Sequence, residues 1–422
     1  MSSKNSLIPL EWSERRQGDV AGFSNGRAYK LTEWEKQGVP VIRLQNLTGS
    51  GKEFYYSNLE LPERQYCGKG DLLYMWSATF GPHIWSGPQA IYHYHIWKVT
   101  CDEVNLTKPY LYQLLGYKTE EWLNKSNGMG ILHVTKGGME DLPLLLPPLP
   151  EQQKIAAILS SVDEVIEKTE VQIQKLKDLK TAMMQALLTK GIGHTEFKDS
   201  PVGRIPVGWR VAILGDLIKS MQGGVSVNGE NREKAQNEIG VLKVSSVFQG
   251  KFIPHKHKAV ISKDVDRARL NPMEGYILFS RANTPALVGE CGYIEKTYSD
   301  LFLPDKLWMI DVKDRSKTNV RWLTYVLSSG RVRKLISDVA TGTSGSMKNI
   351  SKPSLLGIQV AFPAFDEQTR ITKYIHSVDL LLESSIERHK RNKALKKALM
   401  QDLLTGKVRV NVDQATKEKL AS

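Results

Sequence analysis

Hydrophobic side chains recur every three or four residues in two long segments of this chain, residues 151–188 and 367–403. This spacing places them along one face of an α-helix, and neither segment contains a glycine or proline that would interrupt it. Glycines follow both segments, at Gly191 and Gly406, as is common just after a helix ends. The pattern therefore predicts two long amphipathic helices. The expected buried seam is Ile155, Leu159, Val162, Ile166, Ile173, Leu176, Met183, Leu187, Ile371, Ile375, Val378, Leu382, Leu395, Leu399 and Leu403.

The two helical segments are copies of one another. Residues 151–190 match residues 367–406 without a gap, at an offset of 216 (367 − 151) and with 16 identities by direct count. A fainter match, with Trp12 aligned to Trp209, extends the repeat to the regions in front of the helices. A repeat of this length indicates duplication of a whole domain-plus-helix unit rather than a solenoid.

Duplication favours packing of the two helices on each other, because one amphipathic helix cannot bury its own apolar face. A pseudo-twofold axis would make this pair antiparallel. The alternative is that each helix merely covers its own globular part. The expected segments are a first domain at 1–150, a central spacer helix at 151–194, a second domain at 195–366, and a C-terminal spacer helix and tail at 367–422.

The two globular parts have mainly the pattern of short strands separated by loops rich in Gly, Asn and Pro. The expected strands are 39–47 with its equivalent 239–247, and 70–79 with its equivalent 275–284. Helical spacing occurs at 109–123 and 319–336. The predicted fold class is α+β: two similar mixed α/β domains separated by two long helices that form an antiparallel coiled coil, in a pseudo-twofold internal repeat.

The charge balance is strongly basic, with a net charge of +13 and a pI near 9.4. Such a surface favours a polyanionic partner, nucleic acid first and an anionic membrane second. Three cysteines, Cys67, Cys101 and Cys291, have neither disulfide nor metal spacing, which indicates a reducing, cytoplasmic location. We expect no signal peptide and no membrane span, because the longest apolar run, from Leu142, is short and broken by proline.

The catalytic signatures searched for do not occur in the sequence. It has no GxxxxGK(S/T) loop for nucleotide phosphates, and "LPPL" at 146–149 lacks the acidic or amide residue and the aromatic residue of amino-methyltransferase loops. The Glu-Phe-Lys at 196–198 follows a helix and is interpreted as a linker. Two His-x-His pairs, at 93–95 and 255–257, each supply half of a metal site, and zinc needs more ligands. We therefore expect no catalytic residue, metal or cofactor in this chain.

Polar side chains suited to nucleic acid occur at matching places in the two globular parts, because amide, cationic and small hydroxyl groups contact base edges and phosphates. In the expected strands they are Arg43, Gln45, Asn46, Lys243, Ser245 and Ser246. In the loop after 340 they are Lys348, Asn349 and Lys352, and in its counterpart after 125 they are His133 and Lys136. Taken singly, each is more typical of a solvated loop; their duplication on a basic chain favours a binding role.

These motifs resemble the specificity subunit of Type I restriction-modification systems. Each half opens with "IP", a tryptophan and a Gly-Asp pair, carries an "IRLQNL" or "LKVSSV" segment and a "GDLLY" or "GYILFSRAN" segment, and closes on the repeated helix. The most specific stretches are "LPPLPEQQKIAAILSSVD" and "FKDSPVGRIPVGW", and the resemblance covers nearly the whole chain. The first domain departs most, with "YMWSAT" where the second has "FSRANT".

The resemblance implies a non-catalytic reader of double-stranded DNA. Each target recognition domain would read one half of a split, asymmetric site, while the helices set the gap and dock two methyltransferase subunits. Those partners would carry out adenine-N6 methylation with S-adenosylmethionine, and ATP-dependent translocase/endonuclease subunits would use ATP and Mg. The residues expected at the bases are Arg281, Asn283, Lys348 and Asn349 in the second domain, and Arg43, Gln45, Trp76 and Lys136 in the first.

The expected helix length limits the gap between half-sites. A helix of about 38 residues is roughly 57 Å long, which corresponds to about 17 base pairs at ~3.4 Å each. Two other functions stay open at this point. A coiled-coil scaffold that only joins proteins would lack salt-dependent DNA affinity, and a self-contained DNA-modifying enzyme would bind S-adenosylmethionine by itself. An orphan half-reader or a phase-variable allele donor would have the same sequence features.

Overall fold

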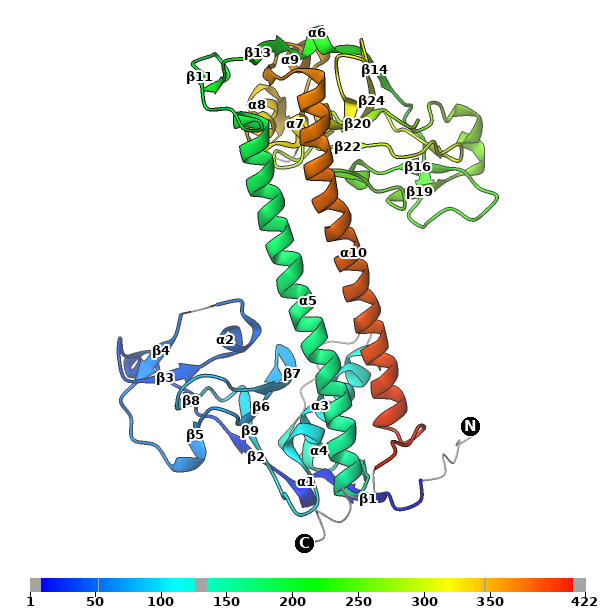
Figure 1. Ribbon diagram of the computed structural model, residues 1–422. Helices are drawn as coiled ribbons and strands as arrows, with labels where there is room; N and C mark the ends of the chain where they lie inside the picture. Colours follow the sequence, from blue (N-terminus) through cyan, green and yellow to red (C-terminus); the bar gives the residue numbers. More distant parts are fainter. Residues whose placement is uncertain (1–8, 52, 126–134, 345–346, 413–422) are drawn as a thin grey trace. The chain divides into compact units, whose positions relative to one another are not determined.

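The computed structural model describes residues 9–51, 53–125, 135–344 and 347–412. The chain forms two compact units (Figure 1). Unit 1 comprises the residues up to Val171 together with those from Glu387, and unit 2 comprises Gln172–Ile386. Each unit therefore contains one globular domain and one half of each long helix.

The long helices are α5 (Leu149–Lys190) and α10 (Phe365–Leu403), with 42 and 39 residues. In unit 1 the first half of α5 packs beside the second half of α10, and in unit 2 the second half of α5 packs beside the first half of α10 (Figure 1). The helices are thus antiparallel in both units, and the predicted coiled-coil fold is confirmed. Both are followed by a glycine in the left-handed region, Gly191 with φ of 67° and Gly406 with φ of 73°.

Most of the predicted seam faces inward. Ile155, Leu159, Ile371 and Ile375 are fully buried in the domain cores, and most of the others are buried or half-buried. The prediction for Leu395 was wrong, because its side chain is 50% exposed. At this level of α10 the next residue, a lysine, turns inward to form an ion pair, which a pattern of apolar residues alone does not reveal.

The described part of unit 1 forms three sheets and four α-helices besides its halves of the long helices. A two-stranded sheet pairs β1 (Ser13–Arg16) with β10 (Pro143–Leu146). One four-stranded sheet has the order β2 (Ala21–Asn25), β9 (Ile96–Cys101), β6 (Leu72–Ser77), β7 (Thr79–Ile84); the other has the order β4 (Tyr55–Ser57), β3 (Val39–Ile42), β8 (Ala90–Tyr92), β5 (Tyr66–Cys67). The helices are α1 (Gln17–Val20), α2 (Leu44–Thr48), α3 (Lys108–Lys125) and α4 (Lys136–Glu140).

Unit 2 repeats this plan with additional strands. Its two-stranded sheets pair β13 (Arg210–Ile213) with β27 (Gln359–Phe362), and β11 (Phe197–Lys198) with β12 (Ile205–Pro206). The six-stranded sheet has the strand order β14 (Ile218–Gly223), β24 (Leu307–Val312), β20 (Ile277–Ser280), β22 (Cys291–Tyr293), β18 (Gly250–Phe252), β17 (Val247–Phe248). The four-stranded sheet has the order β15 (Gly229–Glu230), β19 (His257–Val260), β16 (Gly240–Leu242), β23 (Leu301–Phe302). The three-stranded sheet has the order β21 (Ala282–Asn283), β26 (Met347–Asn349), β25 (Thr341–Ser344). The helices are α6 (Leu214–Leu217), α7 (Val320–Ser328), α8 (Gly330–Val339) and α9 (Lys352–Leu356).

The internal repeat is visible in the pairing of elements. The β1–β10 pair of unit 1 corresponds to β13–β27 of unit 2, and the central β6–β9 pair corresponds to β20–β24. Of the predicted elements, 109–123 is helical within α3, whereas 319–336 forms two helices, α7 and α8, that meet at Ser329.

The strands expected at 39–47 and 239–247 end early. Strand β3 stops at Ile42 and is followed by helix α2, and β16 stops at Leu242 and is followed by a short 3₁₀ helix at Val244–Ser246. In the first case the Asn46 side chain caps the turn, since its Oδ1 accepts a hydrogen bond from the Arg43 N–H at 2.9 Å. Local hydrogen bonds of this kind favour a helical turn over continued strand pairing.

Candidate nucleic-acid interface

The first turn of each long helix contains a glutamate that binds the start of its own domain and the segment after the other helix. In unit 1 the indole Nε1 of Trp12 donates to Glu151 at 3.0 Å, and Arg409, which follows α10, donates to the same carboxylate at 2.7 Å from Nε and from Nη2. The carboxylate is buried, and this is the kind of bidentate pair that holds an arginine in place.

Unit 2 has the equivalent arrangement at Glu367. Its carboxylate accepts a hydrogen bond from Trp209 Nε1 at 2.8 Å, from the backbone N–H of Ile192 at 2.9 Å, and lies 2.8 Å from Nε2 of His194. The last two residues follow α5. The aligned Trp12 and Trp209 are therefore explained by one structural role, anchoring each domain to the first turn of a helix.

The glutamine that follows each glutamate ties the long helix to a helix of the domain. Gln152 accepts from the Thr107 N–H at 2.9 Å and donates to the carbonyls of Asn105 and Pro147. Gln368 accepts from the Asn319 N–H at 2.9 Å and makes the corresponding two donations to Lys317 and Pro363. Both glutamines are fully buried, so each is a buried structural link between a long helix and its domain.

The aspartate of each repeated Ser-Val-Asp joins three elements. Asp163 of α5 pairs with Lys396 of α10 at 2.6 Å and accepts from Gln113 of α3 at 2.9 Å. Asp379 of α10 pairs with Lys180 of α5 at 2.7 Å and accepts from the Tyr325 hydroxyl of α7 at 2.9 Å.

The two lysines are also 216 residues apart (396 − 180), so the same joint occurs once in each unit. In the unit 2 joint, burial and the Asp379 carboxylate raise the pKa of Tyr325 well above its ordinary value. The hydroxyl therefore stays a hydrogen-bond donor to Asp379, and the joint fixes how the helices lie against each domain.

In unit 2 the structure brings together predicted site residues that are far apart in the sequence. Strand β21 pairs with β26, so that Asn283 faces Lys348 and Ala282 faces Asn349. Arg281 lies just before β21, and the backbone of Ile350 donates to its carbonyl at 2.9 Å. Asn283, Lys348 and Asn349 thus lie on two adjacent strands, with Arg281 directly before the first of them.

The side chains of this group differ in how free they are. The amine of Lys348 donates to the Ser337 carbonyl at 2.8 Å, and Asn283 Nδ2 contacts the Ser280 hydroxyl at 3.4 Å. The guanidinium of Arg281 lies 5.8 Å from the centre of the Trp308 ring, and its Nε is buried without a hydrogen-bond partner among the described residues. Asn349 is exposed.

The other unit 2 candidates are more scattered. Lys352 is exposed at the start of α9, Ser245 is exposed, and Lys243 is half-buried, in the turn after β16. The prediction for Ser246 does not agree with its position, because its side chain is fully buried and cannot meet a ligand at the surface.

In unit 1, Arg43 is held by aromatic rings. Its guanidinium lies 4.9 Å from the ring centre of Tyr55 and 5.9 Å from that of Trp34, an arrangement that keeps a cation in place while leaving its edge donors available. Asn46 is used locally, since its amide also donates to the Gly51 and Glu53 carbonyls.

The remaining unit 1 candidates lie in separate places. Gln45 is half-buried in α2, and Lys136 is exposed at the start of α4, 3.5 Å from Glu140. Trp76 is at the end of β6, where its indole Nε1 donates to the Tyr94 carbonyl at 2.9 Å. His133 lies outside the described residues.

Sequence reasoning missed the tryptophans on which two of these residues lie. Trp97 of β9 stacks with Trp76 at 5.6 Å between ring centres, and Trp308 of β24 lies under Arg281. Each follows an aliphatic residue, in "IW" and "LW", at the start of equivalent strands. Tryptophans at matching positions of the two halves are therefore the sequence signal that would have identified them.

Among the described residues, neither histidine pair is joined by a third metal ligand. His93 and His95 lie with ring centres 5.1 Å apart, and burial, followed by the charges of His95 and Arg43, lowers the pKa of His93 to about 4. His257 is used by the backbone, with Nδ1 2.8 Å from the Pro254 carbonyl. Across residues 9–51, 53–125, 135–344 and 347–412, no group of three or more His, Cys, Asp or Glu side chains is placed to hold a metal.

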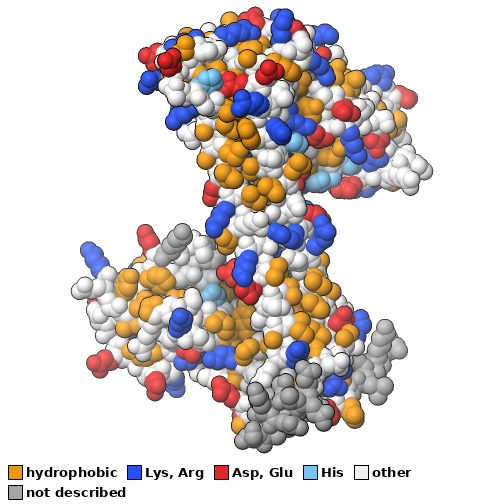
Figure 2. Space-filling model, viewed as in Figure 1, with side chains coloured by type: hydrophobic (Ala, Val, Ile, Leu, Met, Phe, Trp, Pro, Cys, Tyr) orange, Lys and Arg blue, Asp and Glu red, His pale blue; other side chains and the backbone are white. Residues whose placement is uncertain are grey.

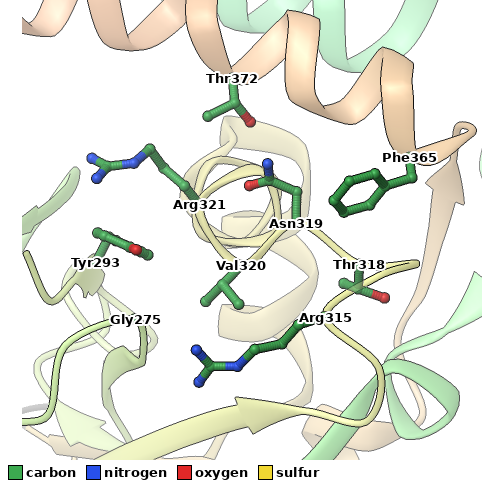
Figure 3. Close-up of a pocket in the computed structure, with 9 residues that line it drawn as sticks. All are labelled: Gly275, Tyr293, Arg315, Thr318, Asn319, Val320, Arg321, Phe365 and Thr372. Carbon is green, nitrogen blue, oxygen red and sulfur yellow. The ribbon is translucent and has the colours of Figure 1, made fainter.

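A cavity of about 270 Å³ lies in unit 2 beside the first turns of α7 and α10 (Figure 3). Two arginines line it, and both are paired with carboxylates, Arg315 with Asp311 at 3.0 Å and Arg321 with Glu295. None of the nine residues labelled there carries a carboxylate, thiol or imidazole. The lining therefore does not supply the paired nucleophile and base that acyl or glycosyl chemistry needs.

The visible surface does not present one continuous basic field. Figure 2 shows Lys and Arg side chains interspersed with Asp and Glu over both units, while hydrophobic side chains gather over the long helices. The exposed apolar residues of these helices are Val165, Val171, Leu179, Tyr374, Leu380, Leu381 and Leu395. Among the described residues, no helix is long and apolar enough to cross a membrane.

Comparison with protein families matches residues 9–178 and 206–397 to the Type I restriction modification DNA specificity domain. The MjaVIII specificity subunit, a Type I restriction enzyme component of Methanocaldococcus jannaschii, is 27% identical over 421 residues, which cover 96% of this chain and 94% of the relative. The EcoBI specificity subunit of Escherichia coli is 23% identical over 410 residues, with 92% and 84% covered.

Two solved structures have the same fold. The S subunit of a Type I restriction-modification system from M. genitalium matches with a TM-score of 0.60 and 13% identity, covering 95% of this chain and 98% of its own. A chain from work on complex assembly and conformational transition of the type I R-M system matches with a TM-score of 0.54 and 17% identity, covering 95% and 99%. At these identities the likeness is one of fold.

Proposed function

The chain belongs to the family of Type I restriction modification DNA specificity domains, and on that premise we propose that it is the DNA-recognition subunit of a Type I restriction-modification complex in the cytoplasm. Each globular domain reads one half of a bipartite, asymmetric double-stranded site, as two-domain readers use two half-sites. The paired helices fix the gap between the halves.

The observation that carries this proposal is the duplication of the joints between domain and helix. Glu151 and Glu367 hold the same kind of indole, and Asp163 and Asp379 make the same interhelical ion pair. A protein that must present two readers at a set distance needs each reader fixed on the spacer, and hydrogen-bonded joints of this type provide that rigidity. A scaffold that only joins proteins has no such need.

The proposal leaves the chemistry to partners. The exposed apolar residues on α5 and α10 offer docking surfaces for two adenine-N6 methyltransferase subunits, because apolar side chains of this kind supply the core of protein interfaces. S-adenosylmethionine would bind to those subunits, and ATP and Mg to the translocase/endonuclease subunits. The lining of the unit 2 cavity and the lack of catalytic motifs in the sequence support a non-catalytic role for this chain.

The test is to combine the purified chain with its methyltransferase subunit and map methylated adenines on random DNA. A bipartite motif with one fixed gap is the expected result. A stable complex without sequence-specific methylation would favour the scaffold, and binding of S-adenosylmethionine by the isolated chain would favour an enzyme.

A further inference from the structure

The two recognition domains share a column of stacked side chains at the same place in their sheets. In unit 1, Tyr74 of β6 is the cross-strand partner of Trp97 of β9, and in unit 2, Phe279 of β20 is the partner of Trp308 of β24. The paired rings are nearly parallel, at 5.9 Å and 15° in unit 1 and 6.0 Å and 12° in unit 2.

One further residue completes each column. In unit 1, Trp76 lies two positions after Tyr74 in β6 and therefore points to the same face. In unit 2, the residue two positions after Phe279 is Arg281, directly after the end of β20. Trp76 stacks on Trp97 at 5.6 Å and 16°, and the Arg281 guanidinium lies 5.8 Å from the Trp308 ring centre. The same position therefore carries an indole in one domain and a guanidinium in the other.

Each column has a buried base and a third side chain that is only half-buried. Trp97 and Trp308 are 2% and 4% exposed, and the rings beneath them are fully buried. Trp76 and Arg281 are only partly buried. A flat side chain fixed on a buried tryptophan loses little conformational freedom on binding, which is what precise base recognition requires.

The chemistry of Arg281 suits a base edge. Its backbone is fixed on both sides, by its N–H to the Lys306 carbonyl at 3.0 Å and by the Ile350 N–H to its own carbonyl at 2.9 Å. No ion pair of Arg281 is present among the residues that the structure describes, and its Nε has no partner. A half-buried guanidinium held over a tryptophan ring, with no side-chain ion pair or hydrogen bond among the described residues, is suited to the O6 and N7 acceptors of guanine.

The chemistry of Trp76 is different. The single N–H of its indole is used by the Tyr94 carbonyl at 2.9 Å, so the ring has no free donor for a base. The rings of Tyr94 and His95 also contact Trp76, at 6.2 Å and 5.6 Å between ring centres, and the part of its ring that stays exposed is apolar. An apolar contact of this kind distinguishes thymine by its C5 methyl group.

We infer that these two equivalent positions are specificity determinants with opposite chemistry: Arg281 on Trp308 recognises guanine in one half-site, and Trp76 on Trp97 recognises a thymine methyl in the other. Trp97 and Trp308 are positioning residues that hold them. The inference rests on the proposed function, because it assigns the reading residue within the same domains.

The test uses the chain in complex with its methyltransferase subunit and measures methylation of the mapped site and of single-base analogues. Replacing the recognised guanine with 7-deazaguanine, which removes N7, should lower methylation about 5- to 150-fold for the native chain. Arg281→Ala should cause a similar loss at that one position, and the analogue should then cost nothing further. Arg281→Lys keeps the charge but not the planar fork, and should lose the preference as well.

The thymine side is tested in the same way. Uracil in place of the recognised thymine should lower methylation for the native chain, Trp76→Phe should keep this dependence on the methyl group, and Trp76→Ala should abolish it. Trp308→Phe keeps an aromatic ring under Arg281 and should weaken the guanine preference. It should leave unchanged the formation of the complex and the preference for thymine over uracil in the other half-site.

The matched control is Arg331→Ala, which removes an exposed arginine of unit 2 that has no such stacking. It should change no single base preference. A uniform loss over all sequences for Arg281→Ala, restored by Arg281→Lys, would make Arg281 a phosphate contact and overturn the inference. If the native complex gave no bipartite motif at all, the proposed function would fail first, so the two failures are distinguishable.

Discussion

Removing the amine of Lys180 should destabilise unit 2 more than removal of any other single lysine charge on α5. Its ion pair with Asp379 is largely excluded from water, with the two side chains 12% and 7% exposed. Loss of one partner from a buried pair costs about 3–5 kcal/mol, because the other charge stays buried without compensation. Asp379 keeps the Tyr325 hydroxyl, and Lys251 lies 3.7 Å away, so we expect a cost near the lower limit.

The equivalent pair in unit 1 gives a comparison. Lys396 and Asp163 are 23% and 33% exposed, so solvent screens them more, and Lys396→Ala should cost about 1 kcal/mol, as for more exposed pairs. The control is Lys175→Ala, which changes an exposed residue of α5, the helix of Lys180. It should change the free energy of unfolding by about 0.5 kcal/mol or less. The assay is urea unfolding followed by circular dichroism, with the transitions of the two units fitted separately.

A double-mutant cycle separates the ion pair from packing. Lys180→Met should cost much less in an Asp379→Asn background than in the native chain, since no carboxylate is then left unpaired. If Lys180→Ala were as mild as Lys175→Ala, or if the two changes were additive, the joint would not hold the helices and the reasoning would be refuted.

Three further predictions concern local features. Gly191→Ala should destabilise the protein more than Gly193→Ala, since both have positive φ but only a Cβ at Gly191 would meet the Glu367 carboxylate and Trp209; equal midpoints in urea would contradict this. The pKa of Asp264 is lowered, chiefly by the hydrogen bond from the Asn228 N–H. Asp264 therefore stabilises the folded chain at pH values above the ordinary carboxyl pKa, and this stabilisation is lost as the pH falls through the lowered pKa. Asp264→Asn should remove this acid-dependent loss of stability from the unfolding curve. Burial raises the pKa of Cys67 to about 12, so a thiol reagent at pH 8 should label it only after unfolding, and rapid labelling of the native chain would contradict this.

The sequence predicts the helices well and the sites only in part. The spacing of apolar residues identifies α5 and α10, because helix formation depends on local sequence. The repeat at an offset of 216 residues identifies their antiparallel pairing, because a duplicated unit favours a pseudo-twofold arrangement. Leu395 was placed wrongly, since the apolar pattern cannot show that Lys396 turns inward to an aspartate.

The proximity of reading residues is harder to predict. Arg281 and Lys348 are 67 residues apart (348 − 281), and only the pairing of β21 with β26 brings them together. Pairing between distant strands is set by the whole sheet rather than by nearby residues. The tryptophan under Arg281 likewise depends on the pairing of β20 with β24.

The most direct test of the central claim is a domain exchange. Residues 1–150 would be replaced by the corresponding domain of another family member, and the methylated adenines of the complex with its methyltransferase subunit would be mapped on random DNA. The account predicts that one half of the bipartite motif changes while the other half and the gap are kept. A motif that changed in both halves, or a gap that changed with the domain, would contradict it.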